Sequence, residues 1–133
     1  MATYKDIRIT WQFLDNHPNS YFIFGDNLQR RGKGGAATIR DHPHAIGFIT
    51  KKFPDNNDGS FYMPEEYSSV FFEELKKLEK VIKSNPHKTF YISKLGAGLA
   101  NKFRIWELLV QHNLTLTLEK YNNVVFCWED RLS

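Results

Sequence analysis

The feature that most constrains the fold of this chain is an alternation of short strand-like apolar runs with helical patterns. The expected strands cover residues 4–9, 21–24, 47–50, 89–92 and 124–128. The expected helices cover residues 35–41 and 64–84, and a helical region opens over 104–112 and extends toward 121. Strands separated by helices predict an α/β fold, with a mostly parallel sheet covered by helices on both faces.

The segment 64–84 is the strongest of these patterns. Pro64 suits a first helical turn, and Glu65 and Glu66 favour the positive end of a helix. The apolar residues recur at steps of three and four and define one face: Tyr67, Phe71, Leu75, Leu78 and Ile82.

The length of 133 residues predicts a single domain spanning residues 1–133. Hydrophobic residues make up 41% of the chain, which excludes a disordered protein. The single cysteine, Cys127, lies in a strand-like run and is expected to be an inert core thiol. With no disulfide possible within the chain, a reducing cytoplasm is the expected compartment.

Several function classes are disfavoured. We see no signal peptide and no apolar run long enough to cross a membrane, so no membrane partner is expected. The net charge of +3 suits an anionic small molecule better than a nucleic acid. His42 and His44 have no metal-ligand partners at suitable spacing, so no metal site is expected. No cofactor is expected either. The oligomeric state is left open.

The first candidate binding loop follows the strand at 21–24. Gly25, Asp26 and Asn27 come first, and Gly32, Lys33, Gly34, Gly35 and Ala36 follow. Glycines at positive φ, ahead of a helix N-terminus and among basic side chains, form an anion cradle. Asp26 and Asn27 are suited to contact ribose hydroxyls or polarise a substrate. The alternative is an exposed flexible loop with solvated charges.

A second loop of similar design follows the strand at 89–92. Its candidate binding residues are Lys94, Gly96, Ala97, Gly98, Leu99 and Asn101. The alternative is a tight turn between strand and helix. Two such loops on neighbouring strands would hold the two sides of a diphosphate.

Thr50, Lys51 and Lys52 end the strand at 47–50. A lysine beside a phosphate site is either a charge partner or, if its pKa is depressed, a nucleophile. Because side chains alternate along a strand, at most one of the two lysines should face a pocket. A solvated pair is the alternative.

Together these segments resemble the macrodomains, and within them the branch of terminal ADP-ribose protein glycohydrolases. The likeness rests on three motifs in the same chain order. These are the Gly-Lys-Gly-Gly-Ala-Ala core within residues 25–39, the strand ending in the double lysine at 48–52, and the loop 94–99 followed by Trp106. Small relatives of this kind also occur in phages, which would place the protein in a host cytoplasm.

The resemblance implies a three-layer macrodomain-like sandwich with ADP-ribose, free or attached to a macromolecule, across the carboxyl edge of the sheet. It also implies that Lys51 attacks the distal ribose. The aspartate that completes turnover in that branch is replaced here by Ala100, with Asn101 next. An aspartate that reads adenine near the first strand also has no clear counterpart. Asp26 is the nearest carboxylate that could substitute in catalysis.

We therefore expect recognition of ADP-ribose or a derivative, with hydrolysis of an ADP-ribosyl bond or of ADP-ribose 1″-phosphate. The alternative is a non-catalytic module that binds or sequesters an NAD-derived nucleotide signal. A nucleic-acid binder is the third reading, and it is disfavoured because the strand aromatics are better explained by core packing.

Overall fold

The computed structural model describes residues 1–130, apart from the side chains of Gly35 and Ala36. Within that part, the chain forms a five-stranded sheet in the order β1-β5-β4-β2-β3. Every strand pairing is parallel. The strands are Thr3–Tyr4 (β1), Ser20–Asn27 (β2), Ala45–Lys51 (β3), Thr89–Ile92 (β4) and Val124–Phe126 (β5). The predicted α/β class with a parallel sheet is therefore confirmed.

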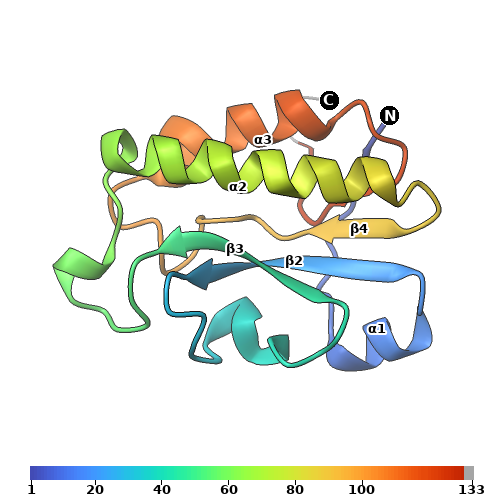
Figure 1. Ribbon diagram of the computed structural model, residues 1–133, viewed down its shortest axis with the longest axis horizontal. Coiled ribbons are helices and arrows are strands. Elements are labelled where there is room, and N and C mark those ends of the chain that lie inside the picture. Colours follow the sequence, from blue (N-terminus) through green and yellow to red (C-terminus); the bar gives the residue numbers. More distant parts are fainter. Residues whose placement is uncertain (131–133) are drawn as a thin grey trace.

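Helices lie on both faces of the sheet (Figure 1). The long helix α2 (Pro64–Ser84) crosses one face beside the π-helical segment η3 (Trp106–Val110) and α3 (Gln111–Leu118). On the other face lie α1 (Trp11–Asn16) and the 3-10 helix η1 (Gly35–Ile39). A short 3-10 turn, η2 (Asp58–Ser60), precedes α2. The arrangement is compatible with a three-layer α/β fold.

Each face of the sheet has its own hydrophobic core. On β2 the side chains alternate, so Ile23 packs into the larger cluster with α2 and α3, whereas Phe22 and Phe24 pack into the smaller cluster with Leu14 of α1. The short apolar run at 21–24 is therefore buried from both sides, as expected for a central strand of a parallel sheet.

Helix α2 has the predicted bounds, 64–84. The Glu66 side chain accepts a hydrogen bond from the Met63 N–H at 3.1 Å, which satisfies one free donor at the helix start. The predicted apolar face is buried, and Glu74 is buried with it. Among residues 1–130, no helix combines the length and the apolar character needed to cross a membrane.

Other elements differ from the sequence expectation. β1 covers only residues 3–4, because past Lys5, whose N–H donates to Phe126 O at 2.9 Å, the chain leaves the sheet. Helix α1 was not predicted, although Thr10 caps it by accepting from the Phe13 N–H at 3.1 Å. The expected helix at 35–41 is a 3-10 helix that ends at Ile39.

Candidate functional site

A cleft of about 430 Å³ opens where β2, β3 and β4 end. β2 lies between β4 and β3 in the sheet. All three strands run parallel, so their carboxyl ends meet at one edge and the loops that follow β2 and β4 converge there. This edge is where ligands bind in open parallel sheets.

Most of the predicted site residues line this cleft. Those that do are Gly25, Asp26, Asn27, Gly32, Gly34, Thr50, Lys51, Lys94, Gly96, Gly98 and Leu99. Lys33, Ala97 and Asn101 are outside the lining. The remaining two, Gly35 and Ala36, begin η1, and their side chains lie outside the described residues.

Two of the residues outside the lining, Lys33 and Asn101, have polar side-chain partners elsewhere. The Lys33 ammonium lies 2.6 Å from Asp41 Oδ2. The Asn101 amide donates to both Glu107 carboxylate oxygens at 3.0 Å, and this hydrogen bonding lowers the pKa of Glu107. Asn101 Oδ1 also accepts from the Trp106 N–H at 3.0 Å, so the side chain fixes the start of the following helix.

A β-bulge shapes the cleft floor. Asp26 pairs with Ile49 but the next residue, Asn27, pairs with Lys51, which leaves Thr50 as an extra residue in β3. The Thr50 hydroxyl donates to the Asp26 backbone oxygen at 3.4 Å. Bulges redirect side chains and recur beside functional sites, and here Thr50 and Lys51 both line the cleft.

Asp26 is a buried, ion-paired carboxylate. Its side chain is 2% exposed, and Oδ1 lies 2.7 Å from the Arg40 guanidinium. Oδ2 accepts from Arg30 Nη1 at 3.3 Å, and Oδ1 also accepts from the Asn27 N–H at 2.8 Å. Both carboxylate oxygens are therefore committed to partners within the protein.

Asn27 is likewise used within the loop. Its amide nitrogen donates to the Arg31 carbonyl at 2.7 Å, and its Oδ1 accepts from the Gln29 N–H at 3.0 Å. The polar pair at the end of β2, interpreted from sequence as a possible reader of ribose, thus organises the glycine loop in this structure.

Both loops carry consecutive backbone N–H groups that have no acceptor within the described residues. In the first loop these belong to Gly32, Lys33 and Gly34. In the second they belong to Gly98, Leu99 and Ala100. Successive unbonded N–H groups in a loop attract anions.

The glycine conformations differ from the sequence expectation. Gly32 and Gly96 adopt positive φ, at 93° and 82°. Gly34 has φ of −81°, which any residue can adopt. A Cβ built on Gly34 or Gly98 meets no atom within 4 Å. Gly34 and Gly98 therefore line the cleft with open space where a side chain would lie, and backbone strain does not explain them.

Lys51 is the last residue of β3 and Lys52 follows it, so the alternation of side chains along a strand does not set the directions of the two lysines. Lys51 lines the cleft, with Nζ 4.9 Å from the centre of the Phe61 ring. Lys52 is bonded away from it, with Nζ 2.9 Å from Glu66 Oε1 of α2. From the second loop, Lys94 lines the cleft with Nζ 5.5 Å from the Trp106 ring centre.

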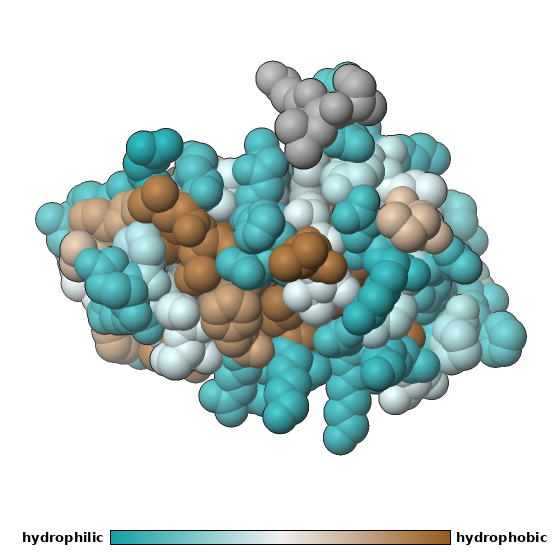
Figure 2. All heavy atoms as spheres, turned by 90° about the horizontal axis from the view of Figure 1, so that it is seen from above, coloured by the Kyte–Doolittle hydropathy of each residue, from teal (hydrophilic) through white to brown (hydrophobic). Residues whose placement is uncertain are grey.

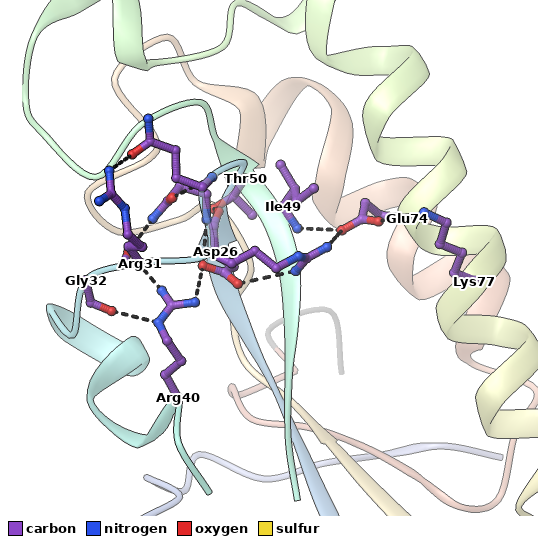
Figure 3. A network of polar contacts seen from close by, with 11 residues as sticks. Asp26, Arg31, Gly32, Arg40, Ile49, Thr50, Glu74 and Lys77 are labelled. Carbon is purple, nitrogen blue, oxygen red and sulfur yellow. Dashed lines mark hydrogen bonds and ion pairs between the residues drawn. The ribbon is translucent and has the colours of Figure 1, made fainter. Parts of the chain in front are cut away.

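Sequence reasoning missed Arg40. It follows η1, lines the cleft, and reaches back to the glycine loop and to Asp26 (Figure 3). Together with Arg31, Lys51 and Lys94 it makes the described lining strongly cationic, and Asp26, already paired, is the acidic residue of that lining. No local pattern marks Arg40, because its partners lie 8 to 14 residues away in the chain.

Cys127 and the histidines lie outside this cleft. Burial raises the pKa of Cys127 to about 12, in keeping with the expected inert thiol. His42 is buried and its Nε2 lies 2.9 Å from Asp15 Oδ1, which ties α1 to the segment after η1. Among the described residues, no group of three or more His, Cys, Asp or Glu side chains is placed to hold a metal ion.

Fold and site together define a parallel α/β protein with a cationic, loop-built cleft at the carboxyl edge of its sheet. The chain belongs to a family of unknown function, DUF7831, whose sequence model matches residues 4–102. That span contains every residue that lines the cleft. No curated protein and no solved structure matches the chain.

Proposed function

We propose that this cleft binds a nucleotide of the ADP-ribose type, with the diphosphate held between the two loops. The observation that carries the proposal is a pair of N–H series on loops that line one cleft, Gly32–Lys33–Gly34 and Gly98–Leu99–Ala100, which find no acceptor in the described part of the chain. Two such series on neighbouring loops suit a ligand with two linked phosphates.

Charge and size support the same ligand class. Arg31, Arg40, Lys51 and Lys94 surround the cleft and favour an anion. Its volume of about 430 Å³ lies within the range of roughly 300–1,000 Å³ typical of small-molecule sites. The loops occur in the chain order of the motifs that resemble macrodomains, and we extend the proposal to that fold family.

Binding without chemistry is the form of this function that the geometry favours. A hydrolase of the kind the sequence resembles needs a carboxylate free to move a proton. Ala100 replaces the expected aspartate, and Asp26 already bonds Arg40 and Arg30. The second candidate, hydrolysis of an ADP-ribosyl bond or of ADP-ribose 1″-phosphate, is favoured by the position of Lys51 at the cleft.

The binding proposal is tested by calorimetry with ADP-ribose, ADP, inorganic pyrophosphate, AMP and adenosine. We expect the ligands with a diphosphate to bind and adenosine to bind weakest, because the proposed binding groups are loop N–H groups and basic side chains, which favour phosphate. Gly98→Val should abolish binding while the protein stays folded, since its side chain would fill open space in the cleft. Gly59→Val is the matched control, because Gly59 is equally open but lies outside the cleft. Equal affinity for adenosine and ADP-ribose would overturn the proposal.

Hydrolysis is tested separately with Lys51 variants. If Lys51 is a nucleophile, Lys51→Ala and Lys51→Arg should both lose turnover on ADP-ribosylated protein or on the 1″-phosphate, because a guanidinium stays protonated. Lys52→Arg is the control, since Lys52 pairs with Glu66 outside the cleft. If Lys51→Arg retained activity, Lys51 would be a charge partner and not a nucleophile. If the wild type bound ADP-ribose without turnover, the protein would be a binding module and not a hydrolase.

A further inference from the structure

We propose that Asp26 and Arg40 are positioning residues, which together hold the glycine loop in the conformation that presents its N–H groups to the ligand. The inference rests on the proposed phosphate-binding function of that loop. It assigns Asp26 a role different from the proton transfer expected from the sequence.

Arg40 contacts three points with one planar guanidinium group (Figure 3). Nε donates to the Gly32 carbonyl at 2.9 Å, and Nη2 donates to the Arg31 carbonyl at 3.1 Å. Nη1 lies 2.7 Å from Asp26 Oδ1. The Arg40 side chain is 14% exposed, so these contacts are largely shielded from water. A lysine has one nitrogen and cannot reproduce this fork.

These bonds fix the direction of two peptide groups. In a trans peptide the carbonyl and the N–H point to opposite sides. Because the carbonyls of Arg31 and Gly32 point to Arg40, the N–H groups of Gly32 and Lys33 point away from it. The Asn27 amide adds a second donor to the Arg31 carbonyl at 2.7 Å. Donors therefore occupy the carbonyl oxygens that would repel an anion.

Asp26 holds Arg40 in place and is itself held. Arg30 Nη1 binds Asp26 Oδ2 at 3.3 Å, and Arg30 Nη2 lies 3.8 Å from Glu74 Oε1 of α2. A Cβ on Gly47 of β3 would lie 2.3 Å from Asp26 Oδ2 and 3.0 Å from Arg30 Nη1, so this pair packs directly against the β3 backbone. The loop conformation is thereby anchored to β2, β3 and α2.

The test compares Arg40→Lys with Arg30→Lys. Both variants keep the charge and both residues contact Asp26, but only Arg40 bonds the loop carbonyls. Titrated with inorganic pyrophosphate and with ADP-ribose, Arg40→Lys should bind about tenfold or more weakly. Arg30→Lys should lose clearly less affinity, because a lysine can still pair with Asp26 Oδ2 and the loop carbonyls keep their Arg40 donors. Equal affinities for the two variants would overturn the inference.

A readout without ligand separates this inference from the proposed function. Backbone ¹⁵N relaxation of residues 31–34 should show lower order parameters in Arg40→Lys than in the wild type or in Arg30→Lys. Unchanged loop order in Arg40→Lys removes the positioning role even if phosphate binds. If the loop loosens in Arg40→Lys but the wild type binds no phosphate, the positioning role stands and the proposed function is wrong.

Gly47→Ala provides an independent variant that changes no charge and no residue of the cleft. Its methyl group would displace the Asp26 carboxylate from its place beside Arg30. We expect folded Gly47→Ala protein to bind pyrophosphate several-fold more weakly and to show the same loop loosening. Wild-type affinity and loop order in this variant would count against Asp26 as a member of the positioning pair.

Discussion

At the scale of single residues, the glycines divide into those the backbone requires and those that only leave space. Gly96 has φ of +82°, and a Cβ there would lie 3.0 Å from Ile105 Cδ1. Gly98, two residues later, has open space around it. The sequence pattern could not distinguish Gly96 from Gly98, because which glycine adopts a positive φ depends on the path of the folded chain.

We expect Gly96→Ala to lower the free energy of unfolding by about 1–2 kcal/mol, from left-handed strain and crowding against Ile105. Gly98→Ala should leave it unchanged or raise it by up to about 1 kcal/mol, because alanine restricts the unfolded chain. Urea unfolding of both variants measures the difference. Equal destabilisation of the two would contradict the assigned conformations.

Cys127 offers a second residue-scale prediction. Burial raises the pKa of the Cys127 thiol to about 12, whereas the thiol of the unfolded chain has a pKa near 9. Between these two pH values the thiol is protonated in the native protein and ionised in the unfolded chain. Because the unfolded state loses its proton first, this group lowers stability as the pH rises between those two values. At about pH 8 we expect iodoacetamide to alkylate the native protein at least about tenfold more slowly than the denatured chain. Similar rates in both states would show that the thiol is accessible.

At the scale of elements, β3 is an edge strand that α2 protects. The buried Glu74 carboxylate accepts from the Ile49 N–H at 2.8 Å, and Tyr67 donates its hydroxyl hydrogen to the Ile49 carbonyl at 2.5 Å. Burial raises the pKa of Tyr67 well above its ordinary value, so the hydroxyl remains a donor. Two side chains of one helix thus satisfy backbone groups that an exposed edge would offer to another strand.

Glu74→Ala should therefore lower the free energy of unfolding by about 1–3 kcal/mol, since it leaves the Ile49 N–H without its acceptor. Glu74→Gln is the control, because its amide oxygen can still accept this hydrogen bond. Denaturant unfolding and light scattering check both stability and self-association. A Glu74→Ala protein as stable as Glu74→Gln would show that the edge contact is unimportant.

The elements were predictable where local chemistry was decisive. α2 and β4 have their predicted bounds, because one carries a full amphipathic period with Pro64 at its start and the other is a short apolar run between polar turns. β1 stops at Tyr4 and η1 ends at Ile39, because the sheet and the loop contacts set their lengths. The burial of Glu74 within a charged helix also depends on β3, which lies outside any local window.

At the scale of the whole molecule, the place of the candidate site was predictable and its polar network was not. Parallel strands bring their carboxyl ends to one edge, so two glycine loops after β2 and β4 had to meet. The contacts from Asp26 to Arg40 and from Arg30 to Glu74 join separate segments and depend on side-chain packing. The sequence suggested contact with ribose or catalysis for Asp26, and it gave no sign of the ion pairs that Asp26 makes with Arg40 and Arg30.

Ligand binding should stabilise the entire domain. With free ADP-ribose at about 100 times its Kd, mass action adds about 2.7 kcal/mol to the free energy of unfolding. For a chain of 133 residues, that corresponds to a rise in Tm of roughly 10 °C. At a fixed concentration of ADP-ribose, the rise in Tm should become smaller as salt is added, because salt screens part of the attraction between phosphate and the cationic cleft.

Gly98→Val tests whether this stabilisation comes from the cleft. Without ligand it should melt at nearly the wild-type Tm, since its side chain meets no protein atom, and ADP-ribose should not raise that Tm. If Gly98→Val gained as much from ADP-ribose as the wild type, the nucleotide would bind elsewhere than in the cleft between the two loops.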